Sequence, residues 1–228
     1  MFRSKKFLYV SLTFFIFLVV LGYTARHTIN QWLIANNYKY YSAPESDLAH
    51  ILLDGLKGIE IAGTAHNTFG LDALNIDSTA DLDTPSKQLE IKRCGTYKKV
   101  DIVAPGDRLP LPDNAVDYVI SSHIIDRFYD PIKTVHEWLR VTKPSGYVYI
   151  IAPHKECFYG KDVPRTTLAE LIDRHKHPHP PIPDHQGHYS IWTTEDFLEL
   201  AQHQKWNVIA WQDVDDKVGD GFTVVIQK

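Results

Sequence analysis

The sequence predicts an α/β fold in which a mostly parallel, seven-stranded sheet closes with an antiparallel hairpin. Short, continuous apolar runs are typical of parallel strands that are buried on both faces. The last two runs are joined by a short acidic turn, which predicts that they pair as a hairpin. The seven runs cover residues 59–62, 73–76, 100–104, 116–121, 147–152, 206–212 and 222–227.

The predicted helices have recognisable ends. Residues 48–58 place apolar side chains at helical spacing and stop at Gly58, whereas Pro144 ends an amphipathic helix over 130–143. Thr193 and Asp196 form a capping box that opens a further helix, 193–204. Between the first two strands, Ile76 follows Gly63 by only 13 positions. A full helix with its turns does not fit there, so the first helix is short or absent.

The composition is typical of one globular domain, which follows an N-terminus that differs from it in charge and hydrophobicity. The chain has 228 residues, of which 44% are hydrophobic, enough to fill one core. Three basic residues lie within the first six positions, leaving 21 of the 24 basic residues against 28 acidic ones beyond them. This negative balance disfavours nucleic acid as a partner. Cys94 and Cys157 are too few for a disulfide framework or a structural zinc site, so we expect free thiols.

Residues 7–25 form an apolar stretch of 19 residues without a charge. At about 1.5 Å per residue, a helix of this length just crosses the hydrocarbon core of a bilayer. A cleaved signal peptide is the rival interpretation, but the stretch is long for one, and the bulky Tyr23 stands where a small residue is expected. We therefore expect a basic tail (1–6), a transmembrane helix (7–25), a juxtamembrane linker (26–48) and one domain (49–228).

Two stretches of the sequence carry a family resemblance. The longer, residues 100–154, contains LPLPDNAVDYVISSH before and through the fourth strand and EWLRVTKPSGY before the fifth. The shorter lies upstream and reads GIEIAGTAHNTFGLDALNID. Together they resemble the class I S-adenosylmethionine (SAM)-dependent methyltransferases of the type 11 group, over residues 55–228 and more weakly after His154. The resemblance implies a Rossmann-like, doubly wound sheet, SAM as the cofactor and methyl transfer as the reaction.

Three residues are candidates for the ribose and methionine parts of SAM. Gly63 ends the first strand, where a glycine lets the backbone approach a ligand at the carboxyl ends of the strands. Asp77 ends the second strand and could accept both ribose hydroxyls, or could be a turn or helix-cap residue. The resemblance implies that Glu60 lies near the methionine end, although a purely structural ion pair would also explain a buried acid.

Asp107, with Gly106 and Leu109 beside it, could bind the adenine amino group or could simply be a turn residue. The sequence also departs from the family pattern in three places. The first loop reads GTAHNTFG rather than a run of alternating glycines, Pro105 stands where an acid is common, and PSG replaces PGG at 144–146. A domain that keeps the fold but has lost the cofactor is therefore an open alternative.

Candidate catalytic residues follow the fourth and fifth strands. Methyl transfer is a direct displacement, so much of the catalysis comes from holding the acceptor in line, and a base is needed only if the acceptor loses a proton. The carboxyl end of the fourth strand faces the cofactor in this fold. We therefore assign His123 and Asp126, after the fourth strand, and His154, after the fifth, as catalytic candidates, and place Ser122 in the substrate pocket. Among these side chains, imidazole has the most suitable pKa for a base. Packing or capping roles are the alternatives for the histidines.

Residues 175–188 hold five histidines and several prolines. The prolines favour an extended path with diverging side chains, so we disfavour a metal site. A loop that covers the active site and supplies His185 or His188 to an acceptor is one alternative, and a plain surface loop is the other. Trp192 would then be the apolar anchor of that loop or a core residue.

These observations predict a membrane-anchored enzyme that moves a methyl group from SAM to an oxygen or nitrogen acceptor and releases S-adenosylhomocysteine (SAH). The expected acceptor is a small or a lipid-linked molecule. A non-catalytic methyltransferase-like domain at a membrane is the alternative, and the absence of GxGxxG disfavours a nicotinamide-dependent oxidoreductase. The basic tail favours a domain on the far side of the membrane, whereas SAM is made in the cytosol, so the topology stays open.

Overall fold

The structure is a computed structural model that describes residues 42–157, 162–178 and 187–228. The predicted transmembrane helix (7–25), most of the predicted linker (26–48) and His185 lie outside these residues. Within the described ranges, none of the helices is long and apolar enough to cross a bilayer.

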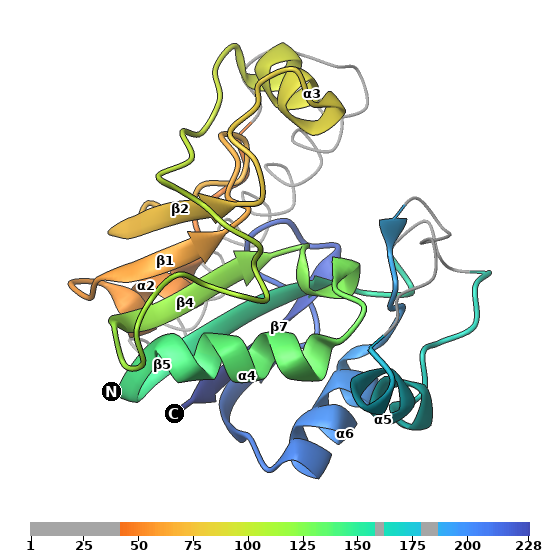
Figure 1. The fold of residues 1–228 in the computed structure, drawn as a ribbon. Helices are drawn as coiled ribbons and strands as arrows, with labels where there is room; N and C mark the ends of the chain where they lie inside the picture. The colour runs from red at the N-terminus through yellow and green to blue at the C-terminus, as the bar shows by residue number, and fades with distance from the viewer. Residues whose placement is uncertain (1–41, 158–161, 179–186) are drawn as a thin grey trace, which may run out of the picture.

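A seven-stranded sheet forms the centre of the domain, in the order β3-β2-β1-β4-β5-β7-β6 (Figure 1). The first five strands pair in parallel, and β7 runs antiparallel between β5 and β6. The predicted strands and the closing hairpin are thus confirmed. The strands are β1 (Gly58–Ile61), β2 (Ala73–Asp77), β3 (Ile102–Val103), β4 (Val116–Ser122), β5 (Thr142–Pro153), β6 (Asn207–Gln212) and β7 (Gly221–Gln227).

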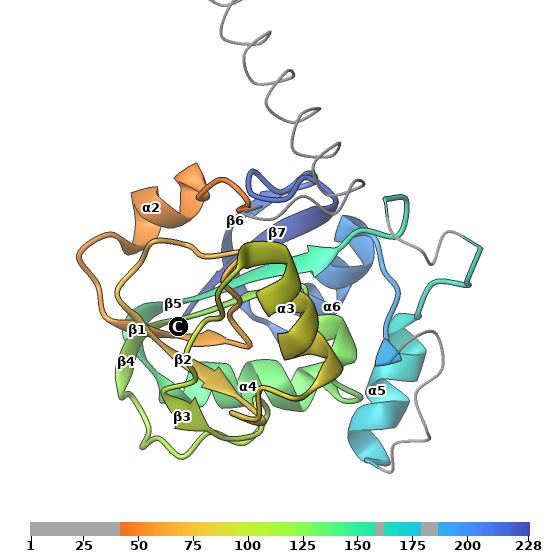
Figure 2. The same cartoon turned by 90° about the horizontal axis from the view of Figure 1, so that it is seen from above.

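Helices pack on both faces of the sheet, which explains why the central strands are continuously apolar. On one face, Trp138 of α4 (Pro131–Val141) and Phe197 of α6 (Thr194–Gln204) share a core with Val148 of β5. On the other face, Leu53 of α2 (Asp47–Leu53) shares a core with Tyr149. Successive residues of a strand point to opposite faces, so both must be apolar here. Figure 2 shows α2 and α4 on opposite sides of the sheet.

The apolar pattern of the sequence does not reveal two helices, α3 (Pro85–Cys94) and α5 (Leu168–Lys176). The buried face of α3 carries the charged Lys87 and Glu90, so it has no apolar stripe. Its ends are nevertheless marked, by Pro85 in the first turn and by Gly95 in the left-handed conformation after the last. As predicted, the chain passes from β1 to β2 without a helix.

Two predicted helix ends are wrong. The first helix stops at Leu53, and Gly58 is instead a residue of β1, where an added Cβ would lie 2.3 Å from the Tyr118 ring. The helix α4 stops at Val141 rather than at Pro144, because the chain turns directly into β5. The capping box of α6 is confirmed: the Thr193 N–H donates to Asp196 Oδ2 at 2.9 Å.

Replacing Trp138 with alanine should destabilise the domain strongly. Its indole is fully buried, and Nε1 donates to the Gly106 carbonyl at 2.8 Å. The expected loss of unfolding free energy is about 3–5 kcal/mol. Urea unfolding measures it, with Trp211→Ala as the matched control: Trp211 is 55% exposed, and its loss should cost less than about 0.5 kcal/mol. Equal effects of the two substitutions would contradict this packing.

Candidate functional site

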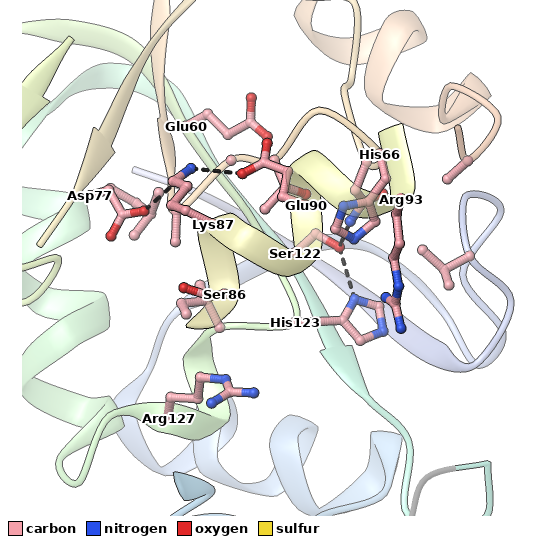
Figure 3. A pocket seen from close by; sticks show the side chains of 18 of the residues that line it. Glu60, His66, Asp77, Ser86, Lys87, Glu90, Arg93, Ser122, His123 and Arg127 are labelled. Atoms are coloured by element: carbon pink, nitrogen blue, oxygen red, sulfur yellow. Dashed lines mark hydrogen bonds and ion pairs between the residues drawn. The ribbon is translucent and has the colours of Figure 1, made fainter. Parts of the chain in front are cut away.

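A pocket of about 640 Å³ opens at the carboxyl ends of β1, β2 and β4 (Figure 3). Open α/β sheets bind ligands at this edge, and the volume is typical of a small-molecule site. The walls come from the β1–β2 loop (62–72), α3, the end of β4, and the β6–β7 loop (213–220). The lining includes Glu60, Gly63, His66, Asn67, Asp77, Lys87, Glu90, Arg93, Ser122, His123, Arg127 and Asp220.

Gly63 is held against the end of β2 by the buried Asn75. The Gly63 N–H donates to Asn75 Oδ1 at 2.9 Å, and Asn75 Nδ2 donates to the carbonyls of Gly63 and Lys99. An added Cβ at Gly63 would lie 2.6 Å from the Glu60 carboxyl carbon and 2.9 Å from Asn75 Oδ1. The position therefore requires glycine for space, and its backbone lines the pocket as the sequence predicts.

Glu60 lines the pocket and also has the ion-pair partner that its burial demands. Its carboxylate pairs with Lys98, a residue that the sequence does not single out. Burial raises the pKa of Glu60, and the ammonium group of Lys98 partly offsets this effect. The functional and the structural interpretations of this acid are therefore compatible.

The buried face of α3 supports the pocket with charged groups. Lys87 Nζ lies 3.0 Å from Glu90 Oε2 and 4.0 Å from Asp77 Oδ2. The other oxygen of Glu90 accepts the backbone N–H groups of Ala65 and Lys98, at 2.5 and 2.8 Å. The carboxylate of Asp77 is partly exposed in the pocket, where it can accept hydrogen bonds from a diol.

Several polar groups in the lining are available to a polar ligand. His66 Nδ1 and Asn67 Oδ1 are buried and find no hydrogen-bond partner in the described part of the chain. Burial lowers the pKa of His66, so its imidazole tends to be neutral. The guanidinium group of Arg93 also lines the pocket and forms no ion pair with a described residue. Unpaired buried polar atoms are costly unless a ligand or water satisfies them.

His123 stands at the end of β4 with a hydrogen-bond partner on each ring nitrogen. Nδ1 lies 2.8 Å from Ser122 Oγ, and Nε2 lies 2.8 Å from Asp220 Oδ1. Burial, the largest influence, lowers the pKa of His123, but the carboxylates of Asp220, Asp215 and Asp126 outweigh it and raise the pKa above its ordinary value. Ser122 and His123 therefore lie in the pocket, as predicted.

Other predicted site residues lie outside the pocket lining. Gly106 accepts a hydrogen bond from Trp138, Asp107 pairs with Lys133 at 2.6 Å, and Leu109 is buried in the core. The predicted adenine contacts are thus turned toward α4. An added Cβ at Gly106 would lie 2.9 Å from the Ile61 side chain, so this turn lies against the end of β1 without lining the pocket.

The predicted catalytic residues Asp126 and His154 also lie outside the lining. Asp126, in the short helix η1 (Ile125–Arg127), is buried and pairs with the buried His188. The backbone of His154 forms an isolated parallel β-bridge with that of Trp192. The Trp192 side chain is fully buried against Phe197. Trp192 is therefore a core residue, the second of its two predicted roles, and His188 is buried beside Asp126 outside the described pocket lining. His185 lies outside the described residues.

One group of side chains has the composition of a metal site. Single ligand atoms of His123, Asp215 and Asp220 lie within 4.8 Å of one another. However, each carboxylate oxygen of Asp215 accepts two backbone N–H groups, so its lone pairs are already used. We therefore treat Asp215 as a structural residue rather than as a metal ligand.

The sheet order, the antiparallel β7 and the position of the pocket are those that the resemblance to class I methyltransferases implies. The glycine after β1, Gly63, and the acid at the end of β2, Asp77, both line the pocket. Comparisons with known proteins agree. Residues 61–150 match the family model described as a methyltransferase domain.

Similar proteins carry matching names. A probable SAM-dependent methyltransferase of Mycolicibacterium smegmatis is 37% identical over 30% of this chain and 27% of its own length. An uncharacterized methyltransferase of Mycolicibacterium vanbaalenii is 27% identical over 69% of this chain and 63% of its own length. The chain thus spans about a quarter of the length of the M. smegmatis relative.

Among solved structures, the chain is similar to a SAM-dependent methyltransferase of Thermotoga maritima, described as a possible histamine N-methyltransferase. The TM-score is 0.51 at 16% identity, covering 90% of this chain and 97% of that one, which shows the fold. Residues 61–150 thus match a methyltransferase domain, and SAM is the cofactor that this match and the names of the relatives imply.

Sequence reasoning misses the charged groups that complete the pocket: Lys87, Glu90, Arg93, Lys98 and Asp220. Four of them lie in α3 or just after it. The sequence of α3 has a proline at its start and a glycine after its end, but its charged residues look like those of a solvent-exposed helix face. Asp220 is one acid of an acidic turn, and only the pairing of β7 with β5 brings that turn to the end of β4. No local signal identifies such a partner.

Proposed function

We propose that this chain is an enzyme that transfers the methyl group of SAM to an oxygen or nitrogen acceptor and releases SAH. The observation that carries the proposal is the pocket beyond β1, β2 and β4, where the close-packed Gly63, the partly exposed Asp77 and unpaired polar groups converge. SAM supplies an electrophilic methyl group next to a positively charged sulfur. The protein's task is to hold the acceptor in line with it.

The residues of the pocket suit the three parts of SAM. Asp77 would accept the ribose hydroxyls, as acids after the second strand of such folds do. The backbone near Gly63, together with Asn67, would face the methionine part. Arg93 would pair with the methionine carboxylate, because a guanidinium group matches a carboxylate with two hydrogen bonds.

Calorimetric titration with SAM and SAH tests the proposal against its alternative, a non-catalytic methyltransferase-like domain. The glycine-poor loop from Gly63 to Gly70 favours that alternative. Saturable binding of both compounds supports the enzyme. If neither binds to protein that is shown to be folded, the non-catalytic interpretation replaces it.

Asp77→Ala should weaken SAH binding about 10- to 100-fold, because two hydrogen bonds from hydroxyl groups to a carboxylate are lost. Lys87 keeps Glu90 as its partner, so the fold should survive. Asp83→Ala is the matched control, since Asp83 is exposed, six positions further on, and outside the pocket. Unchanged SAH affinity in Asp77→Ala would show that the ribose lies elsewhere.

Arg93→Ala should distinguish the methionine part from the adenosyl part of the ligand. We expect about tenfold weaker binding of SAH, which carries the carboxylate, and unchanged binding of 5′-methylthioadenosine, which lacks it. Lys92→Ala, which removes a neighbouring exposed charge, is the control. If both ligands lose affinity equally, or if neither does, Arg93 does not pair with the methionine carboxylate.

We also propose that residues 7–25 anchor the enzyme in a membrane, with a small or lipid-linked acceptor as its partner. The uncharged length of that stretch supports the anchor. The full chain should remain in vesicles after an alkaline carbonate wash, and a chain lacking residues 1–25 should be released. Release of both forms would refute the anchor, and protease protection of the domain in sealed vesicles reports its side.

A further inference from the structure

A chain of hydrogen bonds runs from the pocket to the β6–β7 loop. Asn67 Nδ2 donates to Ser122 Oγ at 2.9 Å, and the next link joins Ser122 Oγ to His123 Nδ1 at 2.8 Å. The last link joins His123 Nε2 to Asp220 Oδ1, also at 2.8 Å. All four residues line the pocket, and Figure 3 shows the link between Ser122 and His123. These bonds connect Ser122, which we expect in the substrate pocket, to the carboxylate of Asp220.

The chemistry of the partners determines which atom donates in each of these hydrogen bonds. An ionised carboxylate only accepts hydrogen bonds, so the hydrogen on the neutral His123 ring lies on Nε2, facing Asp220. Nδ1 is then an acceptor. Because Asn67 already donates to Ser122 Oγ, the serine's own hydrogen is left to point at Nδ1. Neutral His123 is thereby arranged to receive a proton through Ser122.

Asp220 is held in place by a compact turn. The buried Asp215 accepts the backbone N–H groups of residues 217 and 218 with one oxygen, and those of Gly219 and Gly221 with the other. The two glycines flank Asp220, so the turn is closed around the Asp215 carboxylate on both sides of it. This arrangement limits the movement of Asp220 relative to His123.

The backbone of His123 is also unusual. Its φ is 55°, in the left-handed region that side chains other than glycine seldom adopt, and its N–H donates to the Ile151 carbonyl at 2.8 Å. Residues in this conformation persist only where the surroundings hold them, and they gather at functional sites. The imidazole is therefore fixed by its backbone as well as by its two partners.

We propose that Asp220 is a positioning residue that, together with Ser122 and His123, forms a proton relay from the pocket, and that the methyl acceptor is therefore a hydroxyl group. The inference rests on the proposed function and narrows it. A neutral amine can attack first and lose its proton to solvent afterwards. An alcohol is a weak nucleophile until its proton is removed, so it needs such a relay.

The proton and electron balance of the transfer is complete with these groups. The acceptor oxygen bonds to the methyl carbon while the carbon–sulfur bond breaks, and the electron pair of that bond stays on sulfur. The acceptor's proton passes to Ser122 Oγ as the serine's hydrogen passes to His123 Nδ1. The resulting imidazolium is stabilised by the Asp220 carboxylate and loses its proton to solvent after product release.

Charged groups around His123 set the pH at which the relay works. Asp215 and Asp220 face it from the β6–β7 loop, Asp126 faces it from η1, and His66 lies opposite in the β1–β2 loop. The acids raise the pKa of His123, and burial opposes them. Since the relay requires neutral His123, transfer should increase as the pH rises through this raised pKa, and removal of Asp220 should move the increase to lower pH.

The first test measures His123 itself, by NMR titration of histidine ring signals in the full chain saturated with SAH, in detergent. The His123 signal is assigned by its loss in His123→Gln. We expect an Nε2–H tautomer and, in Asp220→Asn, a midpoint about one pH unit lower. Asp213→Asn, an exposed acid in the same loop, is the matched control and should leave the midpoint in place. An Nδ1–H tautomer, or a midpoint that Asp220→Asn leaves unmoved, overturns the relay.

The second test identifies the methylated atom. Membranes and soluble extract of the producing organism are incubated with methyl-labelled SAM and the full chain, with Ser122→Ala and Asp220→Asn in parallel. Label in an alkali-stable methyl ether, with the pH profile of Asp220→Asn shifted to lower pH, supports a hydroxyl acceptor; label on nitrogen overturns it. The two proposals fail separately: lack of SAH binding refutes the methyltransferase, whereas normal SAH binding with an unresponsive His123 refutes only the relay.

Discussion

The chain passes from β1 to β2 without a helix, and this constraint determines the chemistry of the pocket. A helix would satisfy its own backbone groups, whereas a loop that lies under a ligand needs other partners. Here the Gly63 N–H is satisfied by Asn75, and the Ala65 N–H is satisfied by Glu90. Side chains from β2 and α3 thus replace the hydrogen bonds that a first helix would have made.

That replacement has an electrostatic consequence. Glu90 is almost fully buried, so its charge requires Lys87, and the buried Glu60 requires Lys98. Buried ion pairs contribute little net stability compared with an apolar core, but removing one partner is costly. A polar network therefore supports the wall of the pocket, and α3 carries charged residues on the face where α4 carries apolar ones.

The β6–β7 loop joins this network from the other end of the chain. Lys217 donates to the carbonyls of Pro44 and Thr68 and lies 4.5 Å from the centre of the Phe69 ring, while burial lowers its pKa to about 8. It thereby ties the β1–β2 loop to the segment that precedes α2. Three residues later, Asp220 contacts His123. One loop thus contacts both the β1–β2 loop and the end of β4.

The sequence predicts the parts of this domain that depend on local patterns. The strands and α4 follow from apolar periodicity, and Gly63 and Asp77 follow from their places at strand ends. Apolar periodicity does not reveal a helix whose buried face is charged, as in α3. It also cannot pair residues that are far apart in the sequence, such as His188 and Asp126, which are 62 positions apart. His188, the last histidine of the histidine-rich stretch, is buried against Asp126 of η1, a contact that no local pattern predicts.

The position of Ala43 links the pocket to the proposed anchor. Ala43 lines the pocket, and its N–H donates to the His66 carbonyl at 2.7 Å. Residue 25, the end of the proposed membrane helix, precedes it by 18 positions, which even fully extended reach only about 65 Å. With the proposed anchor in a bilayer, the pocket remains within that distance of the membrane surface. The enzyme then meets acceptors in the same membrane at a high effective concentration. A soluble acceptor would gain nothing from such a tether, so the proposed anchor and the proposed relay together favour a lipid-linked hydroxyl group as the acceptor.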